Sequence, residues 1–315
     1  MVLMDQIPVP VLVGPTATGK SRLAVELAHH VAQQGQPAEI VNADSMLVYR
    51  GMDIGTAKPT RVEQEGIRHH LIDILDVTEP GSVAEFQKLA RATIEDCRGR
   101  GVMPIVVGGS ALYTRAVTDQ FDFPGTDPAI RARWERELDR QGAEQLHAEL
   151  ARREPAAATQ ILPGNGRRIV RALEVIELTG SFVAHLPKLK YAIAGVVQVG
   201  LDLDRDILDQ RIAERVDAMW AAGLVNEVRR LVVKGLREGR TASRALGYRE
   251  VLAHLDGELT EDQARTATIT HTRQFARKQL SWYRRDQRIR WVPALAPDRL
   301  SRAVEVTEPT VPARG

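Results

Sequence analysis

The chain has 315 residues, of which 43% are hydrophobic and 27% charged, and its formal net charge is +2 at pH 7. This length and composition predict a large core and two lobes of a mostly helical α/β enzyme, and the small net charge does not by itself indicate a nucleic-acid partner. No run approaches about eighteen apolar residues, and residues 1–10 lack a basic end followed by an apolar core, so we expect neither a membrane span nor a secretory signal. The single cysteine, Cys97, excludes an intrachain disulfide and favours a reducing cytoplasm.

The first feature in chain order is a phosphate-binding loop. Apolar residues 9–13 lead into Gly14–Ser21 (GPTATGKS), which fits the G-x-x-x-x-G-K-[ST] pattern and runs into an amphipathic helix pattern. Glycines allow backbone N–H groups to converge on an anion, Lys20 reaches the terminal phosphates and Ser21 can bind Mg²⁺. The loop therefore predicts phosphate binding, without indicating whether the phosphates belong to a nucleotide.

Two further strand patterns run into different residues at their carboxyl ends. An ATP-using P-loop enzyme usually has a Mg²⁺-binding acid at the end of a second strand, but the strand predicted over 104–107 ends in Gly108-Gly109-Ser110. The strand predicted over 38–42 runs instead into Asp44, which we expect beside the phosphate loop at the carboxyl edge of the sheet. An aspartate after a strand is often only a turn or helix cap, so both roles remain open for it.

The helix signals predict a core interrupted by an insertion. Ser82 and Glu85 form a capping-box pattern for a helix that ends near Arg98, and strand-like residues return at 192–203. Between these parts lie a turn-rich junction at 121–128 and charged helix patterns. The predicted fold is an α/β, P-loop NTPase-like parallel sheet core flanked by helices, with an inserted helical lobe. The predicted ranges are 1–121 and 191–302 for the core, 122–190 for the insertion and 303–315 for a disordered tail.

The insertion contains helix patterns at 129–140, 143–153 and 167–178. After it, helices are predicted over 207–222, 224–234 and 262–285. His69 and His70 lie in a strand-like segment without metal-ligand spacing to other residues, so we expect packing or hydrogen bonding there and no zinc site.

A basic segment lies near the C-terminus of the chain. It contains one acid, Asp286, and aromatic residues between the cations, and basic side chains with aromatic faces are suited to RNA. A solvated helix face with an apolar stripe explains the same pattern, so both interpretations stay open. The cations are Arg273, Arg277, Lys278, Arg284, Arg285, Arg288 and Arg290, and the aromatic residues are Phe275, Trp282, Tyr283 and Trp291.

Several sequence blocks together resemble the bacterial tRNA dimethylallyltransferases. The resemblance is collinear over about residues 8–285, and the block DIGTAKP at Asp53–Pro59 is more specific than the phosphate loop. The other blocks are Gly14–Ser21, Asn42–Ser45, Val48–Met52, His69–Asp73, Val107–Ser110 with Leu112-Tyr113, Arg171–Glu174, Gly247–Glu250, and Arg273-Gln274 with Arg277–Gln279 and Trp282.

The resemblance implies that the loop binds the diphosphate of dimethylallyl diphosphate and not ATP, which accounts for the missing strand-end acid. The family transfers the five-carbon group to N6 of the adenosine at tRNA position 37, beside the anticodon, and releases diphosphate with Mg²⁺ present. Asp44 matches the family's general base, and the Thr16 hydroxyl matches the group that assists departure of the diphosphate.

Further residues take expected roles from the same resemblance. The insertion is expected to contact the anticodon stem-loop, and the enzyme is expected to be a monomer. The implied diphosphate-binding residues are Gly14, Thr16, Ala17, Thr18, Gly19, Lys20, Ser21 and Arg244, and Ser21 is the implied metal ligand. The implied tRNA or adenine contacts are Ser45, Tyr49, Arg50, Lys58, Gly109, Ser110, Arg168, Arg273, Gln274, Arg277, Lys278 and Trp282.

The chain departs from the family pattern at three places away from the loop and Asp44. Ser110-Ala111 replaces a usual Thr-Gly, Gly164-Asn165-Gly166 replaces a usual Asn-Asp-Pro, and Leu47 stands where glutamine is frequent. A carboxylate role at the second site and a base contact from Leu47 are therefore in doubt.

Three alternative functions share parts of this pattern. A small-molecule kinase would need a strand-end acid and a cluster of lid arginines, and a non-catalytic RNA-binding protein would not need Lys20, Ser21 and Asp44 intact. Enzymes that isopentenylate free AMP, ADP or ATP are closest, but the inserted lobe and the basic C-terminal helix favour tRNA.

Overall fold

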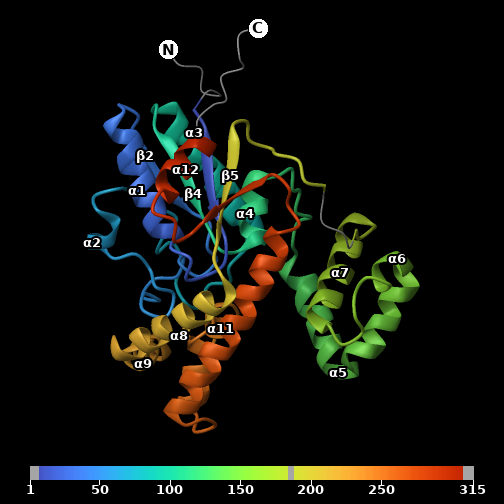
Figure 1. Cartoon of the computed structure of the whole chain (residues 1–315). Coiled ribbons are helices and arrows are strands. Elements are labelled where there is room, and N and C mark those ends of the chain that lie inside the picture. The colour runs from blue at the N-terminus through green and yellow to red at the C-terminus, as the bar shows by residue number, and fades with distance from the viewer. Residues whose placement is uncertain (1–6, 184–187, 308–315) are drawn as a thin grey trace. The chain divides into compact units, whose positions relative to one another are not determined.

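The computed structural model describes residues 7–183 and 188–307. The chain forms two compact units, one comprising Met1–Asp119 with Tyr191–Gly315 and the other Gln120–Lys190. The sequence places the core at 1–121 and 191–302 and the insertion at 122–190. The first unit carries the parallel sheet, and the second is helical (Figure 1).

The sheet of the first unit contains six strands in the order β3-β2-β4-β1-β5-β6, and every pairing between neighbours is parallel. The two central strands, β1 and β4, are buried along their whole length, as expected where helices cover both faces of a parallel sheet. Val11 of β1 pairs with Val106 on one side and Gln198 on the other. The strands are β1 (Val9–Val13), β2 (Ala38–Asn42), β3 (His69–His70), β4 (Met103–Val107), β5 (Val196–Asp202) and β6 (Ile289–Pro293).

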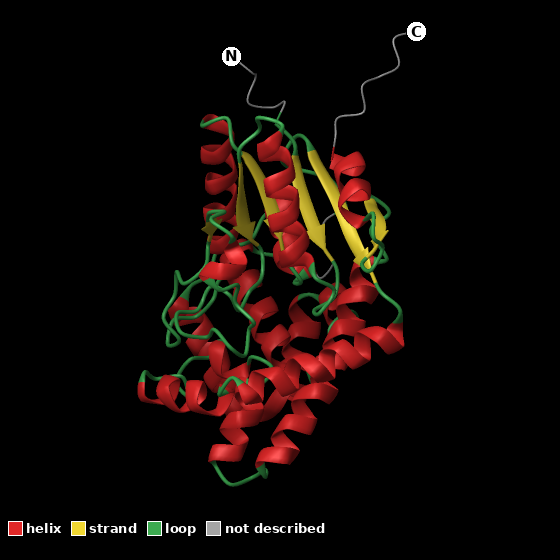
Figure 2. Ribbon diagram, turned by 60° about the vertical axis from the view of Figure 1, so that its left-hand side comes forward, coloured by secondary structure: helices red, strands yellow, loops and turns green. Residues whose placement is uncertain are grey.

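The side chains of β1 point alternately to the two faces of the sheet and belong to two different apolar clusters. Val9, Val11 and Val13 pack in the cluster that includes Phe86 of α3, whereas Leu12 packs in the cluster of α1 and α12. Helices therefore cover both faces of the sheet (Figure 2). The helices of this unit are α1 (Lys20–Gln33), α2 (Arg61–Gln64), α3 (Val83–Gly99), α4 (Ala111–Thr118), α8 (Arg205–Ala221), α9 (Leu224–Val233), the 3₁₀ turn η2 (Ala242–Arg244), α10 (Tyr248–Leu255), α11 (Glu261–Tyr283) and α12 (Arg299–Thr307).

The second unit has its own apolar core, formed by α5 (Pro128–Arg153), α6 (Pro155–Ala158) and α7 (Gly166–Thr179). α5 is two helical stretches joined at Gly142, whose φ of 83° only glycine adopts without strain. Trp134 is buried, and the guanidinium groups of Arg133 and Arg153 lie 5.5 and 5.0 Å from its ring centroid. Buried Glu174 accepts hydrogen bonds from Thr126, Asp127 and Arg131.

The chain leaves and re-enters the first unit at two residues that pair with each other. Asp119 and Tyr191 form an isolated antiparallel bridge, and Ala192 N donates to Thr118 O at 2.8 Å. The Asp119 carboxylate is fully buried and accepts hydrogen bonds from Arg288 at 3.0 and 3.1 Å. The ends of the insertion are therefore fixed together by the core.

The predicted core of a parallel sheet flanked by helices is confirmed, with two differences near the C-terminus. The prediction of a tail disordered from residue 303 is wrong for residues 303–307, which form the end of α12. Ala303 and Val304 are buried in the same cluster as α1, and this packing orders the helix. Residues 308–315 lie outside the described part. Part of the basic segment forms strand β6, which pairs with β5.

Candidate active site

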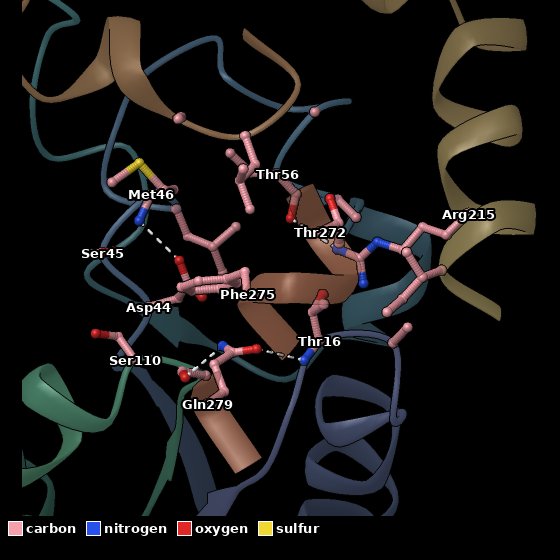
Figure 3. Close-up of a pocket in the computed structure, with 18 of the residues that line it drawn as sticks. Thr16, Asp44, Ser45, Met46, Thr56, Ser110, Arg215, Thr272, Phe275 and Gln279 are labelled. Atoms are coloured by element: carbon pink, nitrogen blue, oxygen red, sulfur yellow. Dashed lines mark hydrogen bonds between the residues drawn. The ribbon is translucent and has the colours of Figure 1, made fainter. Parts of the chain in front are cut away.

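A cavity of about 830 Å³ lies at the carboxyl edge of the sheet. The loops that follow β1, β2 and β4 line one side of it, and α8, η2 and α11 supply other walls. Open α/β sheets bind their ligands at this edge, because the strand ends and helix N-termini expose backbone donors there. Figure 3 shows that Thr16, Asp44, Ser110 and Arg215 reach this cavity from different elements.

The loop between β1 and α1 has the backbone of a phosphate loop. Gly14 has φ 137° and Gly19 has φ 91°, and a Cβ at Gly14 would lie 2.9 Å from Leu201 O, so glycine is required there. Lys20 Nζ folds over the loop and donates to Pro15 O at 2.7 Å. Burial lowers the pKa of Lys20 to about 8, against the effect of Asp44, and the charge of Arg215 lowers it further.

Asp44 stabilises a turn and also lies on the cavity wall. Its Oδ1 accepts from Met46 N at 2.8 Å, and its own N–H donates to Asn42 Oδ1 at 2.8 Å, so it stabilises the turn after β2. The same carboxylate lines the cavity, where Oδ2 would lie 3.6 Å from a Cβ built on Gly109. The turn therefore fixes one carboxylate oxygen and directs the other toward the loop after β4.

Gln279 of α11 connects two of these loops. Its Oε1 accepts from Thr16 N at 3.0 Å, and its Nε2 donates to Gly109 O at 2.6 Å (Figure 3). The side chain is buried, and it leaves no room for a Cβ at Gly109. A Cβ at Gly108 would clash with Ala43 O, so the ends of β4 and β2 approach each other closely.

Several basic side chains line the cavity, and their hydrogen-bond partners differ. Arg249 donates to Glu250 at 2.5 Å, and His271 Nδ1 lies 2.8 Å from the same carboxylate. Arg215 donates only to a carbonyl, Thr56 O, at 3.2 Å among the contacts described for it. Arg244, on η2, also lines the cavity. This excess of positive charge suits a ligand with several negative charges.

The structure brings together many, but not all, of the residues predicted for the site. Within the phosphate loop, Gly14 and Thr18 do not line the cavity, and the Thr18 hydroxyl donates to Pro15 O at 2.9 Å. The predicted residues that line the cavity are Thr16, Ala17, Gly19, Lys20, Ser21, Asp44, Ser45, Gly109, Ser110, Arg244, Gln274 and Lys278.

Tyr49, Arg50 and Lys58 lie away from the cavity. Tyr49 is fully buried in the core, and Lys58 donates to Tyr49 O and to the carboxylates of Asp53 and Asp73. Arg50 forms an ion pair with an exposed aspartate, Asp76, at 2.9 Å. These contacts organise the loop of the DIGTAKP block.

The predicted RNA contacts on the helices have other surroundings. Arg273 donates to Asp209 O, and Arg277 lies 3.5 Å from the Asp209 carboxylate. Trp282, on the same helix α11, is 43% exposed. Arg168 lies on α7 in the second unit. None of these residues lines the cavity.

Sequence reasoning did not place Arg215, Gln279 or Met46 in the site, and it considered Phe275 only as part of the basic segment; all four line the cavity. Arg215 lies in an ordinary charged helix pattern, where one arginine cannot be distinguished from its neighbours. The sequence indicated Gln279 only as one residue of a family block. No local pattern indicates that it contacts Thr16, which is 263 residues away.

One group outside the cavity has metal-ligating side chains close together. Glu39, His70 and Cys97 lie within reach of a shared ion, although their sequence spacing did not indicate it. Arg100, however, donates to both Glu39 oxygens at 3.0 and 2.6 Å and lowers the pKa of Glu39 to about 2. Because the guanidinium already supplies the positive charge, the group is an ion-pair network, and His70 has the hydrogen-bonding role expected for it.

The fold and the site define an enzyme of the P-loop class with a cavity suited to a polyanionic substrate. The family model described as "IPP transferase" matches residues 47–286. The chain is 61% identical over 298 residues to a tRNA dimethylallyltransferase from Cutibacterium acnes, covering 95% of this chain and 93% of that protein. It is 60% identical over 290 residues to the tRNA dimethylallyltransferase from Kineococcus radiotolerans, covering 91% of each.

Solved structures agree with these matches. A tRNA isopentenylpyrophosphate transferase from Bacillus halodurans is 38% identical with a TM-score of 0.69, covering 96% of this chain and 95% of that one. A eukaryotic dimethylallyltransferase acting on tRNA is 27% identical with a TM-score of 0.75, covering 91% and 74%. This chain belongs to the tRNA dimethylallyltransferase family, whose members are prenyltransferases, as its sequence blocks predicted. Among the described residues, no helix is long and apolar enough to span a membrane.

Proposed function

We propose that this protein transfers the dimethylallyl group of dimethylallyl diphosphate to N6 of adenosine 37 in tRNA and releases diphosphate. The observation that carries the proposal is the convergence of the phosphate loop, Asp44 and Ser110 on one cavity. A phosphate loop alone would fit many substrates. Among the described residues, no hydrogen-bond donor contacts the second oxygen of the Asp44 carboxylate, and such a group beside the loop fits a reaction that also removes a proton.

Asp44 acts as the general base in this proposal. Adenine N6 is a weak nucleophile because its lone pair is delocalised into the ring, so loss of its proton must accompany formation of the C–N bond. Oδ1 of Asp44 is held by Met46 N, which leaves Oδ2 to accept that proton. Proton transfer of this kind contributes about 10²–10⁴-fold to a rate.

The phosphate loop binds the leaving group. As the C–O bond breaks, its electron pair stays with the diphosphate, whose negative charge is stabilised by loop amides and by the cations of Lys20 and Arg244. The Thr16 hydroxyl assists departure at the bridging oxygen. The hydrogen bond from Thr16 N to Gln279 supports this part, because it fixes the backbone of that residue.

Mg²⁺ fits the donor set at the start of α1. Ser21 offers an exposed hydroxyl on the cavity wall beside Lys20, and Mg²⁺ typically combines one or two protein oxygens with waters and substrate phosphates. When bound, the ion would offset part of the diphosphate charge. Ser21 is the residue of this chain that would hold it.

Recognition of tRNA is assigned to the cavity rim, α11 and the second unit. The target adenine has to leave its stack to reach Asp44, and flipping costs a few kcal/mol, which contacts to the extruded base offset. Phe275, half-exposed on α11, supplies an aromatic face at the cavity, and Ser45 and Ser110 supply hydroxyls. The remaining proposed contacts are Gly109, Arg168, Arg273, Gln274, Arg277, Lys278 and Trp282. The proposal also includes a cytoplasmic location and a monomer, as the family resemblance implies.

The proposal is tested by incubating purified protein with unmodified tRNA, Mg²⁺ and dimethylallyl diphosphate, then analysing the nucleosides by mass spectrometry. We expect an isopentenyl mass gain on adenosine from tRNA, and none on AMP or ATP in parallel reactions. An isopentenyl mass gain on AMP or ATP, with none on tRNA, would show that the substrate is a free nucleotide and not tRNA. The absence of any gain would refute the transferase.

A further inference from the structure

Asn42, the last residue of β2, is bonded to Asp44 through its side chain. Its Oδ1 accepts from Asp44 N at 2.8 Å, and its Nδ2 donates to Asp44 O at 3.1 Å. One side chain therefore holds both backbone polar groups of Asp44. Asn42 is 4% exposed, so little water is available to replace these bonds, and their loss would leave polar groups unpaired. The orientation of the Asp44 backbone, from which the carboxylate projects, depends on Asn42.

A third hydrogen bond fixes the amide plane of Asn42. Its Nδ2 also donates to Leu71 O at 2.9 Å. Leu71 follows β3, in which His70 pairs with Val41 of β2. An asparagine amide has two N–H donors on its nitrogen, and the carbonyls of Asp44 and Leu71 use both of them. A rotated amide would direct its oxygen at these two carbonyls, so the Leu71 carbonyl fixes which way Asn42 faces.

The backbone that presents the Leu71 carbonyl has an uncommon conformation. Leu71 has φ 60° and Asp73 has φ 56°, both in the left-handed region that residues other than glycine rarely adopt. Such backbone persists only where surrounding contacts hold it, and it is concentrated near active sites. Here Asp73 N donates to Leu47 O at 3.2 Å. The 71–73 turn is therefore held against the segment that follows Asp44.

Lys58 supports the same turn from outside the cavity. Its ammonium group donates to the carboxylate of Asp73, to Asp53 at 2.7 Å and to Tyr49 O at 2.8 Å. The Lys58 side chain is 7% exposed, and the scarcity of water strengthens these charge-assisted bonds. Two sequence blocks of the family therefore meet at the 71–73 turn, although no residue of this contact lines the cavity.

We propose that Asn42 positions the Asp44 carboxylate for proton transfer, and that the 71–73 turn, supported by Lys58, holds Asn42 in the required orientation. This rests on the proposed function, in which Asp44 is the general base. The lone pair of N6 forms the C–N bond, and the electron pair of the N–H bond stays on nitrogen as the proton passes to Oδ2 of Asp44. The electron pair of the C–O bond leaves with the diphosphate. Asn42 does not line the cavity, so it is a positioning residue.

The first test compares Asn42→Ala and Asn42→Ser with the wild type in single-turnover transfer at saturating tRNA. Asn42→Ala removes all three hydrogen bonds and should lower the rate about 10- to 100-fold, since displacement of a catalytic group by about 1 Å costs about 10²-fold. A serine hydroxyl can still accept from Asp44 N but cannot also reach Leu71 O, so Asn42→Ser should recover part of the rate. Asn226→Ala, at an exposed position of α9 outside the cavity, should match the wild type.

Calorimetry with inorganic diphosphate and Mg²⁺ separates positioning of the base from a general loss of the site. The side chain of Asn42 bonds to Asp44 and Leu71 and, among the described residues, to no part of the phosphate loop. The diphosphate affinity of Asn42→Ala should therefore stay at the wild-type value while its transfer rate falls. A structural defect of the whole site would lower both. Thermal unfolding shows whether each variant is folded.

A double-mutant cycle tests whether Asn42 acts through the Asp44 carboxylate. Asp44→Asn removes the base but keeps the acceptor for Met46 N (Figure 3). If Asn42 serves to position that base, Asn42→Ala should cause little or no further loss in the Asp44→Asn protein. The same fold-loss in both backgrounds would show that Asn42 acts otherwise.

The contribution of Lys58 is measured by the same kind of cycle. Lys58→Met keeps a long apolar stem without the ammonium group, and it should slow transfer less than Asn42→Ala does. Added to Asn42→Ala, it should cause no further loss. Lys234→Met, at an exposed position after α9, is the matched control. Independent losses would remove Lys58 and the 71–73 turn from the proposal.

Two results would overturn the role of Asn42. One is a folded Asn42→Ala protein that transfers at the wild-type rate, and the other is one whose diphosphate affinity falls as much as its transfer rate. Failure of the proposed function has a different signature, because the wild type itself would then form no modified adenosine. The role assigned to Asn42 would be rejected together with it.

Discussion

Replacement of Asp44 by asparagine isolates the proposed proton transfer. The amide oxygen can still accept from Met46 N, so the turn after β2 should survive. The other carboxylate that lines the cavity among the described residues, Glu63, already accepts from Thr60 N and Oγ1 in a helix cap. With no free carboxylate to substitute for Asp44, we expect a loss near the middle of the general-base range, about 10³-fold, or about 4 kcal/mol in the barrier.

The assay is single-turnover transfer with enzyme in excess over labelled dimethylallyl diphosphate and saturating tRNA. Removal of the Asp44 charge also lowers the pKa of Lys20, so diphosphate affinity is measured separately by calorimetry and should weaken far less than the rate. Asp96→Asn, an exposed carboxylate of α3, is the matched control. A folded Asp44→Asn protein that transfers at the wild-type rate would refute the base assignment.

Other consequences of the structure can be measured directly. Lys20→Ala should weaken binding of dimethylallyl diphosphate in calorimetry, and unchanged affinity would contradict the role of the loop. Because the pKa of Lys20 is about 8, its ammonium is roughly nine-tenths populated at pH 7 and is lost as the pH rises, so affinity should fall above pH 8 in the wild type. Lys20→Arg should remove that dependence, and a persisting fall would point to another group. Gly108→Ala should lower stability by about 1–3 kcal/mol in thermal unfolding, because its Cβ meets Ala43 O, whereas Gly125→Ala, in open space, should not.

The sequence predicted the parts of the site that local patterns encode. The phosphate loop is contiguous, and Asp44 follows a strand that the sequence predicts, although the position of β4 between β1 and β2 was not predicted. Both line the same cavity because parallel strands end at one edge. The short strand β6 was missed because its apolar residues alternate with the charges of the basic segment.

The remaining site residues depend on contacts between distant parts of the chain. Gln279 and Arg215 reach the cavity from helices whose surface patterns look ordinary, and only the tertiary fold selects them. The family blocks, in contrast, do not distinguish residues that bind substrate from residues that stabilise the fold around the site. Lys58 belongs to the most specific block, yet its ammonium group lies between Asp53, Asp73 and the Tyr49 carbonyl, where it stabilises the loop.

The pairing of Asp119 with Tyr191 has a consequence for how this architecture can vary. The core holds the two ends of the insertion at a fixed, short distance, whatever the length of the segment between them. The entropy cost of closing a loop grows only slowly with the number of residues in it. The inserted segment also has its own apolar core. Evolution can therefore lengthen, shorten or exchange that segment, and a protein engineer can replace it with a tight turn, without changing the register of the sheet or the geometry of the catalytic cavity.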